Sequence, residues 1–331
     1  MRRRLDSIIG AALCSAALLA GCAPGTGDSD GGGTANHLSY LYFTDGPDEQ
    51  VTRDLVARFE RDTGTTVDLQ IIPFSELEQQ LQARINSGNA PDVVRLHTLT
   101  GFRDALLDLA ASGQDIAGEF LDEAQSYIHN PSGELVGLPS DLTMNGPFVN
   151  TDQFARAGVP LPPRDRPWTW DELVASAKRV QQAVGTPYAI AYDKSGHRVS
   201  GLFSQFGTNL YGADGAVQFD PARATAAARL FVELNQQGVM SKDFWLESGT
   251  KYKGANDIFL SQDAPVYFSG NWQVSQFARN ATFGWTAIPN PCAQRCGGFP
   301  GGKFMAAFKS SVNPQLAARF IAFMNSRESQ E

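Results

Sequence analysis

The sequence predicts an α/β protein with two lobes, and three observations support this. Strand-like and helix-like patterns alternate between residues 38 and 96, which is typical of a parallel sheet covered by helices. A second α/β region follows from about residue 169. The chain has 331 residues, which is long enough for two domains of roughly 100–200 residues each.

Two helices are expected between the strands of the first region. The first begins at Pro47 and ends at Gly64, because proline suits a first helical turn and glycine a helix end. The second begins at residues 75–78, Ser-Glu-Leu-Glu, which fit a capping box. The apolar faces are expected to be Val51, Leu55 and Phe59 in the first helix and Leu77, Leu81 and Ile85 in the second. The expected strands are 38–43, 67–72 and 91–96. Ligands of such sheets lie beyond the carboxyl ends of the strands.

The second region has a similar pattern. Thr169-Trp170-Asp171-Glu172 fits another capping box and opens a helix to about Val184. The remaining expected elements are a strand at 188–192, helices at 198–210 and 221–237, strands at 265–268 and 303–308, and a last helix at 314–324.

The amino-terminal segment has the pattern of a bacterial export signal. Three arginines at 2–4 precede an apolar stretch at 8–19, which is shorter than the roughly 20 residues that cross a bilayer. Leu19-Ala20-Gly21-Cys22 resembles the lipobox of bacterial lipoproteins, which implies cleavage after Gly21 and a lipid on Cys22. The alternative is a plain secretory signal with an accidental cysteine. Residues 22–36 are then expected to form a glycine-rich flexible tether.

Charge and cysteine content narrow the class of protein. The net charge of −8, and the lack of a basic cluster once the export signal is removed, argue against nucleic-acid binding. Once Cys14 and Cys22 are set aside, Cys292 and Cys296 remain, and an oxidising compartment favours a disulfide between them over two free thiols. This short loop is expected to stiffen its own turn and to add little to the stability of the fold.

Several segments together resemble the family 1 extracellular solute-binding proteins of ABC importers, the group of maltose-binding protein. Their order and spacing extend across residues 38–326. The segments are Leu55–Gly64, Gly88–Val94, Gly137–Pro139, Trp168–Leu173, Ser269–Trp272, Gly301–Gly302 and Phe320–Ser326.

The resemblance implies a type II periplasmic-binding-protein-like fold, in which a hinge joins two lobes and a sugar binds in the cleft between them. The chain would cross between lobes near 139–145 and near 298–302, where glycine and proline suit a hinge. The first lobe would comprise 37–141 and 302–331, and the second 142–301. Family members usually continue beyond the helix that ends near Asn325, so the second lobe is expected to be incomplete and to expose apolar surface.

The resemblance also implies a monomeric, non-enzymatic binder on the extracytoplasmic face of the cell membrane. Its partners would be a carbohydrate ligand and the permease subunits of the importer, with membrane contact through the lipid on Cys22. No cofactor or metal is expected, since the four histidines show no metal-ligand spacing.

The candidate ligand-binding residues combine an aromatic platform with polar groups for hydroxyls. Trp272 follows a strand end and matches the family's ligand-stacking tryptophan; core packing is its alternative. Asp45 follows the first strand, and the alternative to ligand binding there is a helix N-cap. For His97 the alternative is a structural role. Asp92, Trp168 and Trp170 are interpreted as structural. The remaining candidates for the site are Thr98, Asp141, Asp193, Asn209 and Trp245.

Two alternative functions stay open at this point. Acidic residues beside a sugar cleft also fit a secreted hydrolase that acts on glycans. A glycerophosphodiester ligand would require cations at the cleft, and the chain offers Arg95, Arg198, Lys251 and Lys303.

Overall fold

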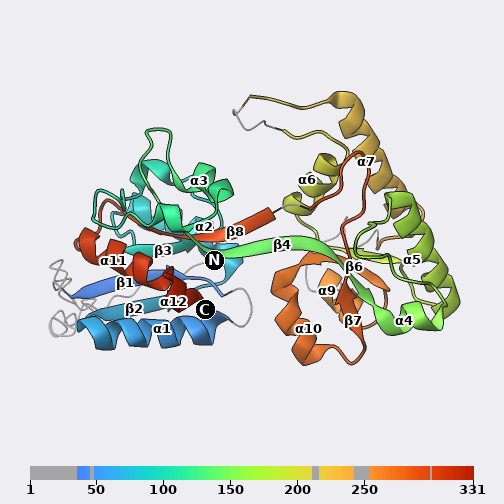
Figure 1. The fold of residues 1–331 in the computed structure, drawn as a ribbon, viewed down its shortest axis with the longest axis horizontal. Coiled ribbons are helices and arrows are strands. Elements are labelled where there is room, and N and C mark those ends of the chain that lie inside the picture. The colour runs from blue at the N-terminus through green and yellow to red at the C-terminus, as the bar shows by residue number, and fades with distance from the viewer. Residues whose placement is uncertain (1–35, 45–47, 211–215, 242–253, 299) are drawn as a thin grey trace, which may run out of the picture. The chain divides into compact units, whose positions relative to one another are not determined.

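The computed structural model describes residues 36–44, 48–210, 216–241, 254–298 and 300–331. These residues contain one mixed sheet with the strand order β2-β1-β3-β8-β4-β6-β5, and β7 pairs with β4 outside this path. Helices lie around both ends of the sheet (Figure 1). The predicted α/β class is therefore confirmed.

The first half of the sheet has the predicted parallel order. Strand β1 (His37–Tyr42) pairs in parallel with β2 (Thr66–Ile71) and with β3 (Val93–Leu96). Helix α1 (Asp48–Thr63) joins β1 to β2, and α2 (Leu77–Asn86) joins β2 to β3. The carboxyl ends of the three strands therefore lie at one edge, where the chain turns through Phe43 and His97.

Two details of these helices differ from the prediction. Val51 is exposed, and the buried face of α1 consists of Thr52, Val56 and Phe59. The predicted capping box at 75–78 is absent, because residues Phe74–Glu76 already form a short 3₁₀ helix, η1. The N-cap residue Glu76 has helical dihedral angles and makes no capping bond, whereas a capping side chain needs an extended backbone.

Strands β4 (Leu138–Asn150) and β8 (Pro300–Ala307) link the two halves of the sheet. They pair antiparallel from Leu138 opposite Met305 to Met144 opposite Pro300 (Figure 1). β8 also pairs with β3, and the later part of β4 pairs with β6 (Val266–Gly270) and β7 (Trp285–Ala287). Residues 139–145 and 300–302 of the predicted crossing segments thus lie in paired strands.

The second half contains the predicted helix from the second capping box. Thr169 and Glu172 form both bonds of the box at the start of α5 (Trp170–Val184). Strand β5 (Ile190–Tyr192) pairs in parallel with β6. Helix α6 (Gly196–Gln205) begins earlier and ends earlier than predicted, while α7 (Pro221–Gln236) agrees with the prediction to within a residue. The other helices are α3 (Asp122–Ile128), α4 (Thr151–Arg156), α9 (Ala255–Leu260), α10 (Val274–Asn280), α12 (Arg327–Gln330) and short 3₁₀ turns η2 (Arg103–Ala105), η3 (Ala117–Glu119) and η4 (Asn271–Gln273).

Alternation along the strands places separate apolar cores on the two faces of each half. In β1, Tyr40 and Tyr42 join one core, and Leu41 and the following Phe43 join the other. In β6, Phe268 and Tyr267 are divided in the same way. Because successive side chains of a strand point to opposite faces, this pattern follows from the strand period.

The last long helix packs on the first half of the sheet. α11 (Pro314–Met324) has the predicted bounds and buries Phe320 and Ile321. The Phe320 ring lies 5.4 Å from the ring of Tyr40 in β1. The lobe boundaries proposed from the sequence remain a prediction. Within the described residues, no helix has both the length and the apolar character that crossing a bilayer requires.

Candidate functional site

The structure describes six of the eight predicted ligand-binding residues. Asp45 and Trp245 lie outside the described residues, as does the predicted lipidation site Cys22. The other six come from β3, β4, β5, η4 and the loops that follow them. The described members of the set are His97, Thr98, Asp141, Asp193, Asn209 and Trp272.

Asp193 follows β5 and is the centre of a hydrogen-bonded cluster. Its carboxylate accepts one bond from the Tyr267 hydroxyl and one from the Ser269 hydroxyl, each 2.6 Å long. Both donors lie on β6, which pairs with β5. Burial raises the pKa of Asp193, although the two hydroxyl bonds and Arg198 oppose that shift. The Gln273 amide extends the cluster by donating to the Tyr267 hydroxyl over 3.2 Å.

Trp272 lies in η4, directly after β6, and contacts the guanidinium of Arg198. The guanidinium carbon is 4.5 Å from the centroid of the indole ring, within cation–π range. Gly270 permits this position, because a Cβ atom there would lie 2.0 Å from Cζ3 of the indole. Trp272 is half-buried, as a side chain that stacks on a ligand would be.

A second charged cluster lies on the first half of the sheet. The buried Arg95 pairs with Asp141 over 2.5 Å and with Asp48 over 3.1 Å, and it donates to the Phe43 carbonyl over 2.6 Å. Burial by itself lowers the pKa of Arg95, but the neighbouring carboxylates outweigh it and the net shift is upward. Asp141 also accepts from the Lys303 backbone amide over 2.9 Å. The predicted ligand-binding residue Asp141 therefore already has structural partners.

His97 lies near side chains of α2 and α6. Its Nε2 atom lies 3.3 Å from Glu78 in α2, and its ring centroid is 6.5 Å from that of His197 in α6. Burial lowers the pKa of both histidines, and Arg198 lowers that of His197 further. Both imidazoles are therefore neutral at pH 7. The half-exposed ring of Phe74 packs edge-on against His97 at 5.2 Å.

The remaining predicted residues are less central. Thr98 accepts the Thr100 amide in a local turn, and Asn209 lies half-buried in the loop after α6, away from the bonds of the Asp193 cluster. Asp92 braces β1 as interpreted, since its carboxylate accepts from the backbone and hydroxyl of Ser39. Trp168 and Trp170 are buried in the core, which confirms their structural interpretation.

The charges of the two clusters balance. Three carboxylates, Asp48, Asp141 and Asp193, stand against three cations, Arg95, Arg198 and Lys303. Sequence reasoning assigned the cations only to an anionic ligand and did not identify Tyr267, Ser269, Gln273 or His197. One sequence signal could have identified Ser269. It is a polar residue near the end of a predicted strand, where side chains reach the edge of the sheet.

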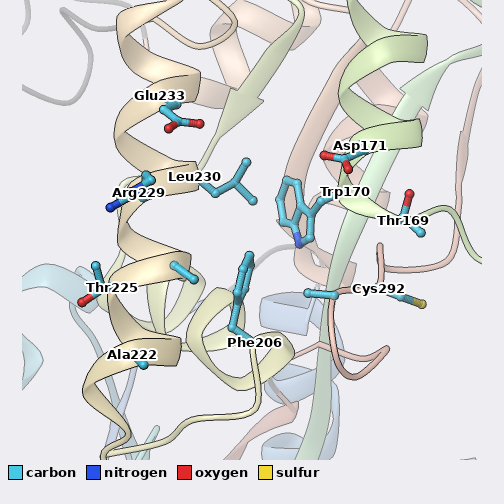
Figure 2. Close-up of a pocket in the computed structure, with 12 residues that line it drawn as sticks. Thr169, Trp170, Asp171, Phe206, Ala222, Thr225, Arg229, Leu230, Glu233 and Cys292 are labelled. Atoms are coloured by element: carbon cyan, nitrogen blue, oxygen red, sulfur yellow. The ribbon is translucent and has the colours of Figure 1, made fainter.

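A groove with no part in these two clusters lies elsewhere in the second half. It is a groove of about 570 Å³ between α5, α7 and the loop that holds the Cys292–Cys296 disulfide (Figure 2). Its floor is apolar and its rim has charges of both signs. Apart from Cys292, no predicted site residue lines it. The lining includes Trp170, Phe206, Leu230, Asp171, Arg229 and Glu233.

Comparisons with known proteins place the chain in a family. The chain belongs to the bacterial extracellular solute-binding proteins, whose family model matches residues 44–331. These are binding proteins rather than enzymes, in agreement with the prediction.

Individual relatives are distant in sequence. A binding protein of Brucella abortus is 25% identical over 279 residues, which cover 79% of this chain and 64% of the relative, so the chain spans about two thirds of that protein. The galactooligosaccharide-binding protein of Bacillus subtilis is 22% identical over 94% of this chain and 75% of its own length. An ABC substrate-binding protein from Listeria monocytogenes in complex with cycloalternan shares the fold, with a TM-score of 0.77, 21% identity, and coverage of 89% of this chain and 76% of that one.

Proposed function

We propose that this protein is the carbohydrate-binding subunit of an ABC importer. The observation that carries the proposal is the half-buried indole of Trp272 beside the hydrogen-bonding groups of Asp193, Arg198 and Gln273. A pyranose ring presents an apolar face to an indole and hydroxyls to the polar groups around it.

Two buried atoms in this cluster make no hydrogen bond within the described part of the chain. They are a donor, Nε of Arg198, and an acceptor, Oε1 of Gln273. A buried polar group without a partner costs about 1–3 kcal/mol. Both atoms are shielded from solvent, so a ligand would gain this energy by shifting the two side chains and supplying their partners. Sugar hydroxyls donate and accept at once, which suits this pair.

The balanced charges favour an uncharged ligand over a phosphodiester. Arg95, Arg198 and Lys303 each lie beside a carboxylate, so the two clusters together have no net positive charge that would attract a phosphodiester. The ligands of two similar proteins, galactooligosaccharide and cycloalternan, are also uncharged carbohydrates.

The finer parts of the proposal concern delivery. The lipid on Cys22 would hold the domain at the extracytoplasmic face of the membrane, with residues 22–36 as tether. The two lobes, 37–141 with 302–331 and 142–301, would close on the sugar by bending the paired strands β4 and β8, and the closed form would dock on the permease. Closure requires that the sugar bind the closed state more tightly than the open one.

Titration calorimetry against a panel of saccharides tests the binding function. We expect at least one neutral saccharide to bind and to change the tryptophan fluorescence, and we expect Trp272→Ala to lose this response. The matched control is Trp285→Phe in β7, a strand that contributes no group to the Asp193 cluster, and it should keep the response. Undiminished affinity in Trp272→Ala would remove this residue from the site. Binding of a glycerophosphodiester alone, or chemical conversion of the saccharide, would favour the respective alternative functions.

The anchor is tested separately by cell fractionation. The wild-type protein should sediment with membranes and Cys22→Ser should not. Membrane association of Cys22→Ser would contradict the proposed anchor without affecting the sugar-binding proposal.

A further inference from the structure

Arg198 lies between Asp193 and Trp272 but makes no hydrogen bond with Asp193. Nε of Arg198 is 3.7 Å from the nearer Asp193 oxygen, which is too long for a hydrogen bond. The same guanidinium lies 4.5 Å from the centre of the indole. Asp193 instead receives its hydrogen bonds from Tyr267 and Ser269. The carboxylate thus takes its hydrogen bonds from hydroxyls, and the guanidinium lies beside it against the aromatic ring.

Arg198 is fixed in this position by its surroundings. Its side chain is only 9% exposed, and its backbone carbonyl accepts a bond of 3.0 Å from the Tyr192 hydroxyl. Nε is buried and has no hydrogen-bond partner in the described ranges. The ligand-binding side of the cluster therefore contains a buried cation whose donor capacity is not fully used.

The contact with Arg198 changes what Trp272 can attract. An indole face carries negative electrostatic potential and by itself binds ammonium groups. Here a cation of the protein already occupies that interaction. A second cation brought to the same ring would gain little from the indole and would be repelled by the guanidinium, and like charges that face each other at a binding site cost several kcal/mol.

We propose that Arg198 is a specificity-determining residue, which makes the site accept sugars with hydroxyl, ring-oxygen or other acceptor groups at the stacked ring and reject amino sugars. The inference rests on the proposed sugar-binding function and adds a ligand class to it. Arg198 donates to an acceptor on the sugar that stacks on Trp272, and its positive charge excludes an ammonium group from the same position.

The test compares three forms of one ligand. The neutral saccharide that binds in the calorimetric panel is titrated beside its amino-substituted analogue, at a pH below the pKa of the amine, and beside the N-acetylated analogue, which has the added bulk but no charge. We expect the wild type to bind the amino analogue more than tenfold more weakly than the N-acetylated one. Equal binding of these two forms by the wild type would overturn the inference.

Variants assign the discrimination to the charge of Arg198. In Arg198→Met the ratio between the two analogues should fall below about threefold, whereas Arg198→Lys should retain rejection of the amine. Arg279→Ala, which removes an exposed arginine from α10, should behave as the wild type. An unchanged ratio in Arg198→Met would contradict the inference. Arg198→Met leaves the largely buried Asp193 carboxylate without a cation, and the variant could fail to fold for that reason. The double variant Asp193→Asn/Arg198→Met removes both charges, and it must also lose the discrimination between the amino and N-acetylated analogues.

The two proposals fail in distinguishable ways. If no saccharide binds to the wild type, the proposed function fails. If a saccharide binds and the amine is rejected equally with and without the charge at position 198, only the specificity role fails. The contact itself has a readout without ligand, because Arg198→Met should shift the fluorescence emission of the free protein and should not do so in a Trp272→Phe background.

Discussion

Gly270→Ala tests whether the position of Trp272 determines ligand binding. The backbone at Gly270 is extended, with φ −159° and ψ 178°, a conformation that alanine adopts without strain. The added methyl group, however, would lie 2.0 Å from Cζ3 and 2.2 Å from Cη2 of the indole. These distances are far below van der Waals contact, so the indole has to move away from its present position.

The expected effect separates affinity from stability. Loss of one aromatic face, roughly 80 Å² of contact, costs about 2 kcal/mol at ~25 cal/mol per Å², which corresponds to about thirty-fold weaker binding. The cost in stability should be near the low end of the ~1–3 kcal/mol range for overpacking, because Trp272 is half-buried and can turn toward solvent.

Calorimetry with the saccharide bound by the wild type measures the affinity, and thermal unfolding measures the stability. Gly146→Ala is the matched control. Gly146 lies on β4 and pairs with Ser269 of β6. A Cβ atom at Gly146 would lie 3.5 Å from Asn290, an ordinary van der Waals distance. We expect Gly146→Ala to bind as the wild type does. Wild-type affinity in Gly270→Ala would refute the argument that the indole must stay where it is.

Two further predictions concern the charged groups. Burial keeps the pKa values of His97 and His197 below their unfolded value of ~6.5. The contribution of these histidines to stability should therefore be complete above that pH, and it should fall as the pH decreases from ~6.5 through the folded pKa values. The double variant His97→Gln/His197→Gln should flatten this dependence in denaturant titrations. Arg95→Ala should lower the free energy of unfolding by about 2–4 kcal/mol, since it removes the buried cation that Asp48 and Asp141 share. Arg53→Ala removes an exposed pair with Glu49 and should cost less than about 0.5 kcal/mol. Equal losses in the two variants would contradict the burial argument.

Local signals in the sequence were sufficient for several elements. The capping box at Thr169 and the proline at 314 each fix a helix start through bonds or dihedral angles within a few residues. The same reasoning failed at residues 75–78, because the chain is already helical at Phe74–Glu76 and no residue there has the extended conformation of a cap.

The buried face of α1 shows where local reasoning ends. Val51, Leu55 and Phe59 recur at helical spacing, and so do Thr52, Val56 and Phe59. Periodicity alone cannot choose between two stripes that share a residue and differ by a fraction of a turn. Packing against β1 and α11 selected the second stripe, so Val51 faces solvent.

The candidate site depends on contacts that no local pattern encodes. The sequence by itself determined the class of the fold and the order of its elements. It also indicated Trp272 as an aromatic group and Asp193 as a polar group at strand ends. Only the tertiary structure decided that Asp193 bonds to Tyr267, 74 residues later, and that Arg95 pairs with Asp141, 46 residues later. The physical reason is the strand order. Pairing of β5 with β6, of β3 with β8 and of β8 with β4 brings distant residues together and thereby sets which charges are neutralised.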